Sequence, residues 1–190
     1  RYTASFESDR SVFDLSDQCG AHVFRGSDLV RRGELDEGIA LLRNGLSLQP
    51  EAELRLRPYY LYLLAEALSE DGETNEALGL LQQAINVLRK SDESWWESAI
   101  HRLTGEILLV QNPAAEEQAE TLFMQAIDVA QTQNAKSLEL RAATSLAHLW
   151  RGQEKADEAR ELLAPIFNWF TEGFETTDLR EAKALLDELA

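Results

Sequence analysis

Two stretches of equal length, "FRGSDLVRRGELDEGIALLRNGL" at residues 24–46 and "LLAEALSEDGETNEALGLLQQAI" at residues 63–85, decide the fold of this chain. When they are aligned, small residues face small residues and leucines face leucines. Four small pairs recur 39 residues apart, namely Gly26 with Ala65, Gly33 with Gly72, Gly38 with Ala77, and Gly45 with Ala84. A fixed period of this length indicates an internal repeat of one supersecondary unit.

The same frame continues through the C-terminal half of the chain. The first small position holds Gly26, Ala65, Gly105 and Ala147, the second holds Gly38, Ala77, Ala119 and Ala159, and the third holds Gly45, Ala84 and Ala126 before it is lost at Ile166. Large apolar residues stay in phase with it at Leu29, Leu68, Leu108 and Trp150, and again at Leu42, Leu81, Phe123 and Leu163. Small residues at fixed places let helices approach closely, so we expect Ala119 and Ala159 to tolerate no large side chain.

Each unit contains two apolar-periodic runs of helical length joined by a polar or glycine-containing turn, which predicts a helix hairpin. A single hairpin cannot bury its apolar face alone, so the hairpins are expected to stack. The spacing is that of a tetratricopeptide repeat (TPR), with a period of 39 to 42 residues instead of about 34. We therefore predict an all-α, right-handed α-solenoid of about four long TPR-like hairpins and a C-terminal capping helix.

The boundaries follow from the same frame. The predicted hairpins span about residues 11–50, 53–90, 93–132 and 135–171, the capping helix spans about 177–190, and residues 1–10 are expected to fray. Thr176, Thr177 or Asp178 can cap the start of that last helix, and Glu181 lies three residues after Asp178, close to a capping box. The whole chain, 1–190, is predicted to be a single TPR domain. Because it begins with Arg1 instead of Met, we expect it to be a fragment of a longer protein.

The charge of the chain limits its partners. The 190 residues carry a formal net charge of -16. Such a field repels phosphate backbones and anionic lipid headgroups, so we expect no nucleic-acid and no membrane partner. The single cysteine, Cys19, cannot form an internal disulfide, and the polar start of the chain is not a signal peptide. A cytoplasmic location is expected.

Four segments carry a resemblance to a known family: "RPYYLYLLAEAL" at 57–68, "WWESAIHRLTGEILL" at 95–109, "LELRAATSLAHLW" at 138–150 and "LLAPIFNWFTEGFETTDLREAKALLDEL" at 162–189. They resemble the C-terminal TPR region of bacterial multidomain signalling proteins. In those proteins an adenylate/guanylate cyclase-like domain or another module precedes a predicted ATPase module and then the repeats. The resemblance covers about residues 55–190 well and the first 50 weakly. It implies a regulatory or interaction role and transfers no catalytic residue; Ala99 departs from it, because an acidic residue is expected there.

No motif for catalysis is present. The sequence lacks the phosphate-binding loop G-x-x-x-x-G-K-[ST], and His22, His101 and His148 have no second histidine or cysteine at metal-ligand spacing. We therefore predict that this chain is not an enzyme and needs no cofactor or metal.

The first helix of each hairpin is expected to line a concave groove. The small-residue frame sets its inward positions. Besides the candidate residues named at the end of this paragraph, these positions are Ser69, Glu70, Ala99, Leu109, Val110 and Thr144. The predicted lining is aromatic and acidic on one side and basic on the other, which suits an extended peptide or a partner helix. A solvated face without function is the alternative. The candidate partner-binding residues are Tyr59, Tyr62, Glu66, Trp95, Arg102, Glu106, Arg141, His148 and Arg151.

The adjacent tryptophans in "SDESWWES" at 91–98 have different predicted roles. Trp96 lies nine residues before Gly105, and large apolar residues, Leu56 and Leu138, occupy the equivalent sites. Trp96 is therefore interpreted as core. The equivalents of Trp95 are polar, so Trp95 is predicted to lie at the mouth of the groove, with packing on the preceding turn as the alternative.

The function that these patterns favour is a non-catalytic protein- or peptide-interaction or regulatory module of a bacterial signalling protein. It would bind a separate partner or a neighbouring domain of the same chain. Two alternatives stay open: a small-molecule sensor domain like that of nucleotide-binding transcription activators, and an enzyme that uses groove carboxylates. The oligomeric state is left open.

Overall fold

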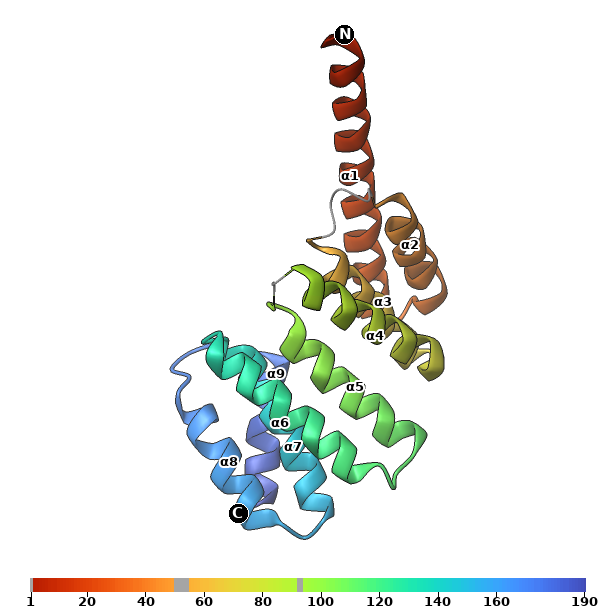
Figure 1. The fold of residues 1–190 in the computed structure, drawn as a ribbon. Coiled ribbons are helices and arrows are strands. Elements are labelled where there is room, and N and C mark those ends of the chain that lie inside the picture. The colour runs from red at the N-terminus through yellow and green to blue at the C-terminus, as the bar shows by residue number, and fades with distance from the viewer. Residues whose placement is uncertain (1, 50–54, 92–93) are drawn as a thin grey trace. The chain divides into compact units, whose positions relative to one another are not determined.

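The computed structural model describes residues 2–49, 55–91 and 94–190, and these residues form nine α-helices and no strand (Figure 1). The predicted all-α fold is confirmed. The chain divides into two compact units, Arg1–Glu93 and Ser94–Ala190, and each is described by itself. The predicted hairpin ends at residues 50, 53 and 93 lie outside the described residues, and the single-domain organisation stays a prediction.

The first unit contains two helix hairpins. Helices α1 (Tyr2–Arg31) and α2 (Leu35–Leu48) form one, and α3 (Arg57–Glu70) and α4 (Thr74–Ser91) form the other. Helix α1 begins at Tyr2, earlier than the expected start near residue 11, and the fraying of residues 1–10 stays a prediction. No proline or glycine occurs between Tyr2 and Cys19, so nothing in the local sequence interrupts the helix there.

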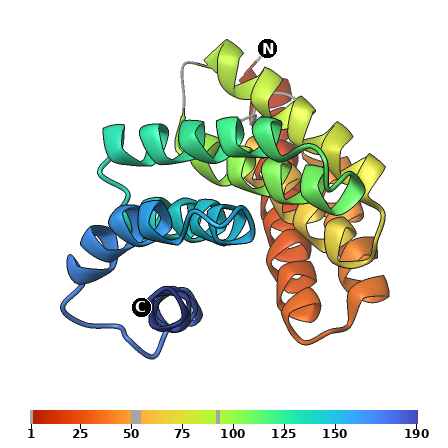
Figure 2. The ribbon, with the colours of Figure 1, turned by 90° about the horizontal axis from the view of Figure 1, so that it is seen from below.

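The second unit contains two more hairpins and a final helix, seen along its axis in Figure 2. The hairpins are α5 (Glu97–Gln111) with α6 (Glu116–Thr132) and α7 (Lys136–Gly152) with α8 (Ala156–Asn168). Helix α9 (Thr177–Glu188) packs against α7 and α8. It occupies the place that the first helix of another hairpin would take, as the predicted capping helix should.

Both hairpins of the first unit turn at a glycine with positive φ. Gly33 has φ 83° and Gly72 has φ 89°, a region that favours glycine. The turns make matching hydrogen bonds: the Glu34 amide donates to the Leu29 carbonyl at 3.0 Å and the Glu73 amide donates to the Leu68 carbonyl at 2.8 Å. These bonds cap the end of the first helix in each hairpin, so the aligned glycines mark the turns.

The small-residue frame marks the helix contacts. All eleven glycine and alanine positions of the frame are buried, and Ala119 and Ala159 are completely covered. At Gly26 on α1 and Gly38 on α2, backbone meets backbone. A Cβ atom added at Gly26 would lie 2.8 Å from the Gly38 carbonyl oxygen, so the two helix backbones touch directly.

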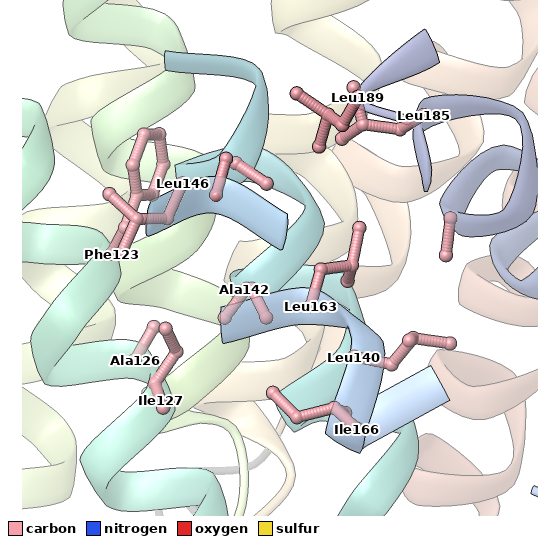
Figure 3. Packing of buried hydrophobic residues seen from close by; sticks show 14 of the residues in the cluster. Phe123, Ala126, Ile127, Leu140, Ala142, Leu146, Leu163, Ile166, Leu185 and Leu189 are labelled. Atoms are coloured by element: carbon pink, nitrogen blue, oxygen red, sulfur yellow. The ribbon is translucent and has the colours of Figure 1, made fainter. Parts of the chain in front are cut away.

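The large apolar residues fill the space around these contacts. In the second unit, one cluster joins α6, α7, α8 and α9, and Figure 3 shows its packed side chains, including Phe123, Leu146 and Leu163. Helix α9 contributes Leu179, Ala182, Leu185 and Leu189 to it. Burial of these side chains holds α9 on the unit, because apolar burial is the main favourable term in folding.

A search of the described helices finds none with the length and apolar character needed to cross a bilayer.

Candidate functional site

In the first unit, three of the candidate residues lie on α3 and form one polar cluster. The Tyr62 hydroxyl donates a hydrogen bond of 2.6 Å to Glu66 Oε1. Tyr62 is only 4% exposed, so its predicted place among the partner-binding residues is wrong, and it supports Glu66 from inside the unit. Partial burial and the nearby Glu66 raise the pKa of the Tyr59 hydroxyl, and Arg31 opposes that shift. Partial burial, followed by the Glu66 charge, also raises the pKa of Glu70. Tyr59, Glu66 and Glu70 are thus near neighbours on α3, and this face as a partner-binding surface stays a prediction.

In the second unit, α5 repeats this arrangement. Arg102 Nη1 lies 2.5 Å from Glu106 Oε1, and Glu106 stands one residue after Gly105 just as Glu66 stands one residue after Ala65. Ser145 on α7 donates a second hydrogen bond of 2.6 Å to the same Oε1. The repeat thus places a carboxylate, held by a donor four residues earlier, at the same point of α3 and of α5.

The basic residues of α7 have partners that the sequence analysis did not identify. Arg141 Nε lies 2.7 Å from Asp178 Oδ2, His148 Nε2 lies 3.4 Å from Glu181 Oε1, and Arg151 pairs with Glu188. All three carboxylates belong to α9. The basic residues on this side of the predicted groove therefore stay exposed, but each one faces a carboxylate of the capping helix.

A sequence signal for these pairs exists. Asp178 and Glu188 each stand 37 residues after their arginine, which is close to one repeat length. Because α9 takes the place of the next first helix, its charges face α7. The capping-box interpretation of Asp178 and Glu181 is wrong, since the residue before α9 is Thr176 and no side-chain cap bond forms there.

Side chains from α5, α6, α7 and α9 line a hollow of about 350 Å³ that is open to solvent. We call it the α5–α7–α9 hollow. Gly105 lets the Phe123 ring of α6 reach it, because a Cβ atom at Gly105 would lie 2.6 Å from Phe123 Cε1. Two predicted groove residues, Glu106 and His148, line it. The full lining is Glu106, Leu109, Phe123, Ser145, His148, Leu149 and Glu181.

Two other positions of the predicted lining are wrong. Ala99 is 3% exposed and Thr144 is 5% exposed, so both are packed inside the unit and cannot contact a partner. They share a helix with exposed groove positions, Val110 on α5 and Arg141 on α7, so the buried stripe of each helix is wider than the small-residue frame alone indicates.

The two adjacent tryptophans differ in burial. Trp95 is 50% exposed, which agrees with its predicted place outside the core. Trp96 is half-buried, and the equivalent Leu56 is 41% exposed, so the interpretation of this series as core is wrong. Trp96 and Leu56 are the residues that directly precede α5 and α3, so each stands at a helix start and not within the packed face of a helix.

This difference gives a paired test. Replacing Trp95 with alanine should change the free energy of unfolding by no more than about 0.5 kcal/mol, whereas Trp96→Ala should cost about 1 kcal/mol because it removes partly buried ring area. Chemical denaturation of both variants measures this. An equal loss from both would place Trp95 in the packed structure instead of at the surface.

The described residues contain no group of histidine, cysteine and carboxylate side chains arranged to hold a metal ion. Of the three histidines, His22 hydrogen-bonds to the Gln18 carbonyl within α1, His101 lies 3.7 Å from Glu97, and His148 faces Glu181. The site is thus made of ion pairs and an apolar floor.

Comparison with protein-family models gives no match, and comparison with curated proteins gives none. Solved structures share the fold. A Podosopora anserina protein described as a kinesin light chain with nearly identical TPR-like repeats matches with TM-score 0.70 and 18% identity over 92% of this chain and 85% of that chain. BtubC (BKLC) from P. vanneervenii matches with TM-score 0.64 and 17% identity, covering 95% of this chain and 89% of that chain.

The apo form of RapI is similar as well, with TM-score 0.67 and 15% identity over 88% of this chain and 46% of that chain. At these identities the likeness concerns the fold alone. The chain therefore has a TPR-like repeat fold, as the period and the small-residue frame predict.

Proposed function

We propose that this chain is a non-catalytic module that binds a protein or peptide through the faces of its first hairpin helices. The observation that carries the proposal is the α5–α7–α9 hollow, where an apolar floor is bordered by ordered polar groups. Apolar contact area with a few fixed polar groups is the usual composition of a recognition surface. Its open shape favours a side chain of an extended partner over an enclosed small molecule.

The TPR-like neighbours support the same assignment at the level of fold. Stacked hairpins form extended surfaces that such repeat proteins use for binding. The net charge of -16 supports a protein partner over nucleic acid or an anionic membrane.

We also propose the finer context that the resemblance of residues 55–190 implies. The module would act in the cytoplasm, inside a bacterial signalling protein, on a neighbouring ATPase or cyclase-like domain or on a separate partner. The paired charges of Glu106, Arg141 and Arg151 favour this role over an enzyme that uses groove carboxylates, because those groups already have partners.

Selection of a random 12-residue peptide library on the intact chain tests the proposal. Enriched peptides should lose at least tenfold in affinity when Ser145, at the edge of the hollow, is replaced by tryptophan, which fills the space. Met124→Trp, on the exposed side of α6, is the matched control and should leave affinity unchanged. Failure to enrich any peptide, or equal binding by both variants, would contradict a recognition role for this face.

A further inference from the structure

Not every carboxylate near α7 is paired with a side chain that carries a permanent positive charge. Arg102, Arg141 and Arg151 each pair with a carboxylate, Glu106, Asp178 and Glu188 respectively. Glu181 differs, because the ionic partner that the structure gives it is the His148 ring, at 3.4 Å. A histidine is charged only when protonated, whereas an arginine is charged at every physiological pH. Glu181 is thus the carboxylate on this face whose partner carries no permanent charge.

Glu181 stands at the border of the α5–α7–α9 hollow, together with Glu106. The Glu106 contacts with Arg102 and Ser145 both use Oε1, so Oε2 takes part in neither bond. Glu181 is 55% exposed, and a ligand can reach it from solvent. The hollow therefore offers two carboxylates at its border and no permanent cation among its lining residues.

The floor of the hollow is apolar. Leu109 and Leu149 line it together with the edge of the Phe123 ring, which reaches it past Gly105. A lysine or arginine side chain fits this combination, since it lays an apolar stem on such a surface and keeps its charged end beside polar groups. An acidic side chain would meet Glu106 and Glu181, and a purely apolar one would leave Glu181 without a permanent ion partner.

We infer that the α5–α7–α9 hollow receives a lysine or arginine side chain of a partner peptide, with its cationic end at Glu181 and Glu106. This inference rests on the proposed peptide-binding function and adds the chemical class of the ligand. The overall charge of the chain acts in the same direction, because a net charge of -16 attracts a basic segment and raises its rate of encounter.

The test uses three short synthetic peptides, acetyl-Ala-Arg-Ala-amide, acetyl-Ala-norleucine-Ala-amide and acetyl-Ala-Glu-Ala-amide, titrated into the isotope-labelled chain and followed by amide chemical shifts. The arginine peptide should give saturable shifts at the amides of Ser145, His148 and Leu149. The norleucine and glutamate peptides should bind at least tenfold more weakly. Binding of the arginine peptide should weaken as salt rises from 50 to 500 mM, because salt screens exposed charges.

Two variants locate the interaction. Glu181→Gln should weaken the arginine peptide at least fivefold, and His148→Lys should do so more strongly because it supplies Glu181 with a permanent cation. Glu175→Gln, an exposed carboxylate before α9 and outside the hollow lining, should change nothing. Since both glutamates are exposed, neither change should disturb folding.

Equal binding by the three peptides, shifts confined to other residues, or the same affinity for Glu181→Gln and Glu175→Gln would each overturn the inference. The proposed function is tested separately. Enriched library peptides that need the hollow but contain no essential lysine or arginine would leave peptide binding in place and reject only the basic ligand.

Discussion

Replacing Phe123 with alanine should lower the free energy of unfolding by about 3–5 kcal/mol, the usual range for a buried aromatic side chain. Phe123 is 1% exposed and belongs to the core cluster that joins α6 to α9 (Figure 3). Its ring also packs against Gly105 on α5, a position that has no side chain to fill the space if the ring is removed. The cavity left behind would therefore lie between α5 and α6, at the floor of the hollow.

Met124→Ala is the matched control for this experiment. Met124 is the next residue on α6 but is 51% exposed, so its truncation should change stability by no more than about 0.5 kcal/mol. Urea denaturation of both variants, followed by far-ultraviolet circular dichroism, gives the comparison. A similar small loss for Phe123→Ala and Met124→Ala would mean that α6 does not pack against the other helices of the second unit as described.

Substitution of Gly26 by alanine should destabilise the first unit by about 1–3 kcal/mol, the cost of overpacking a close contact. The new Cβ would lie 2.8 Å from the Gly38 carbonyl oxygen and 3.1 Å from the Leu42 amide nitrogen. Both are backbone atoms, so relief requires α1 and α2 to move apart. Helix propensity alone predicts the opposite sign, because alanine is favoured over glycine in a helix interior by about 1 kcal/mol.

Gly79→Ala separates these two effects. Gly79 lies inside α4, and a Cβ atom there would meet nothing within 4 Å. With no contact to disturb, the propensity term acts alone, and the change should stabilise the chain by about 0.5–1 kcal/mol. Thermal unfolding of the two variants should shift in opposite directions. A shift of the same sign for both would show that Gly26 is not held against α2.

What the sequence determined by itself was the hairpin repeat. Small residues at Gly38, Ala77, Ala119 and Ala159 recur every 39 to 42 residues because backbones can touch only where side chains are small, and that requirement is local to each hairpin. The turns at Gly33 and Gly72 follow for a similar reason, since a positive φ restricts the residue type. Helical spacing also places Tyr62 and Glu66 one turn apart on α3, where their side chains hydrogen-bond.

The tertiary structure alone decided which charges are available to a partner. Helical spacing places Arg141, His148 and Arg151 on one face of α7, but it does not say what stands opposite that face. Helix α9 stands there and supplies Asp178, Glu181 and Glu188, so a side that was predicted to be basic is neutral or acidic. The burial of Ala99 and Thr144 was likewise not evident from the small-residue frame. The physical reason is that ion pairing and burial depend on residues distant in sequence, whereas helix periodicity depends on near neighbours.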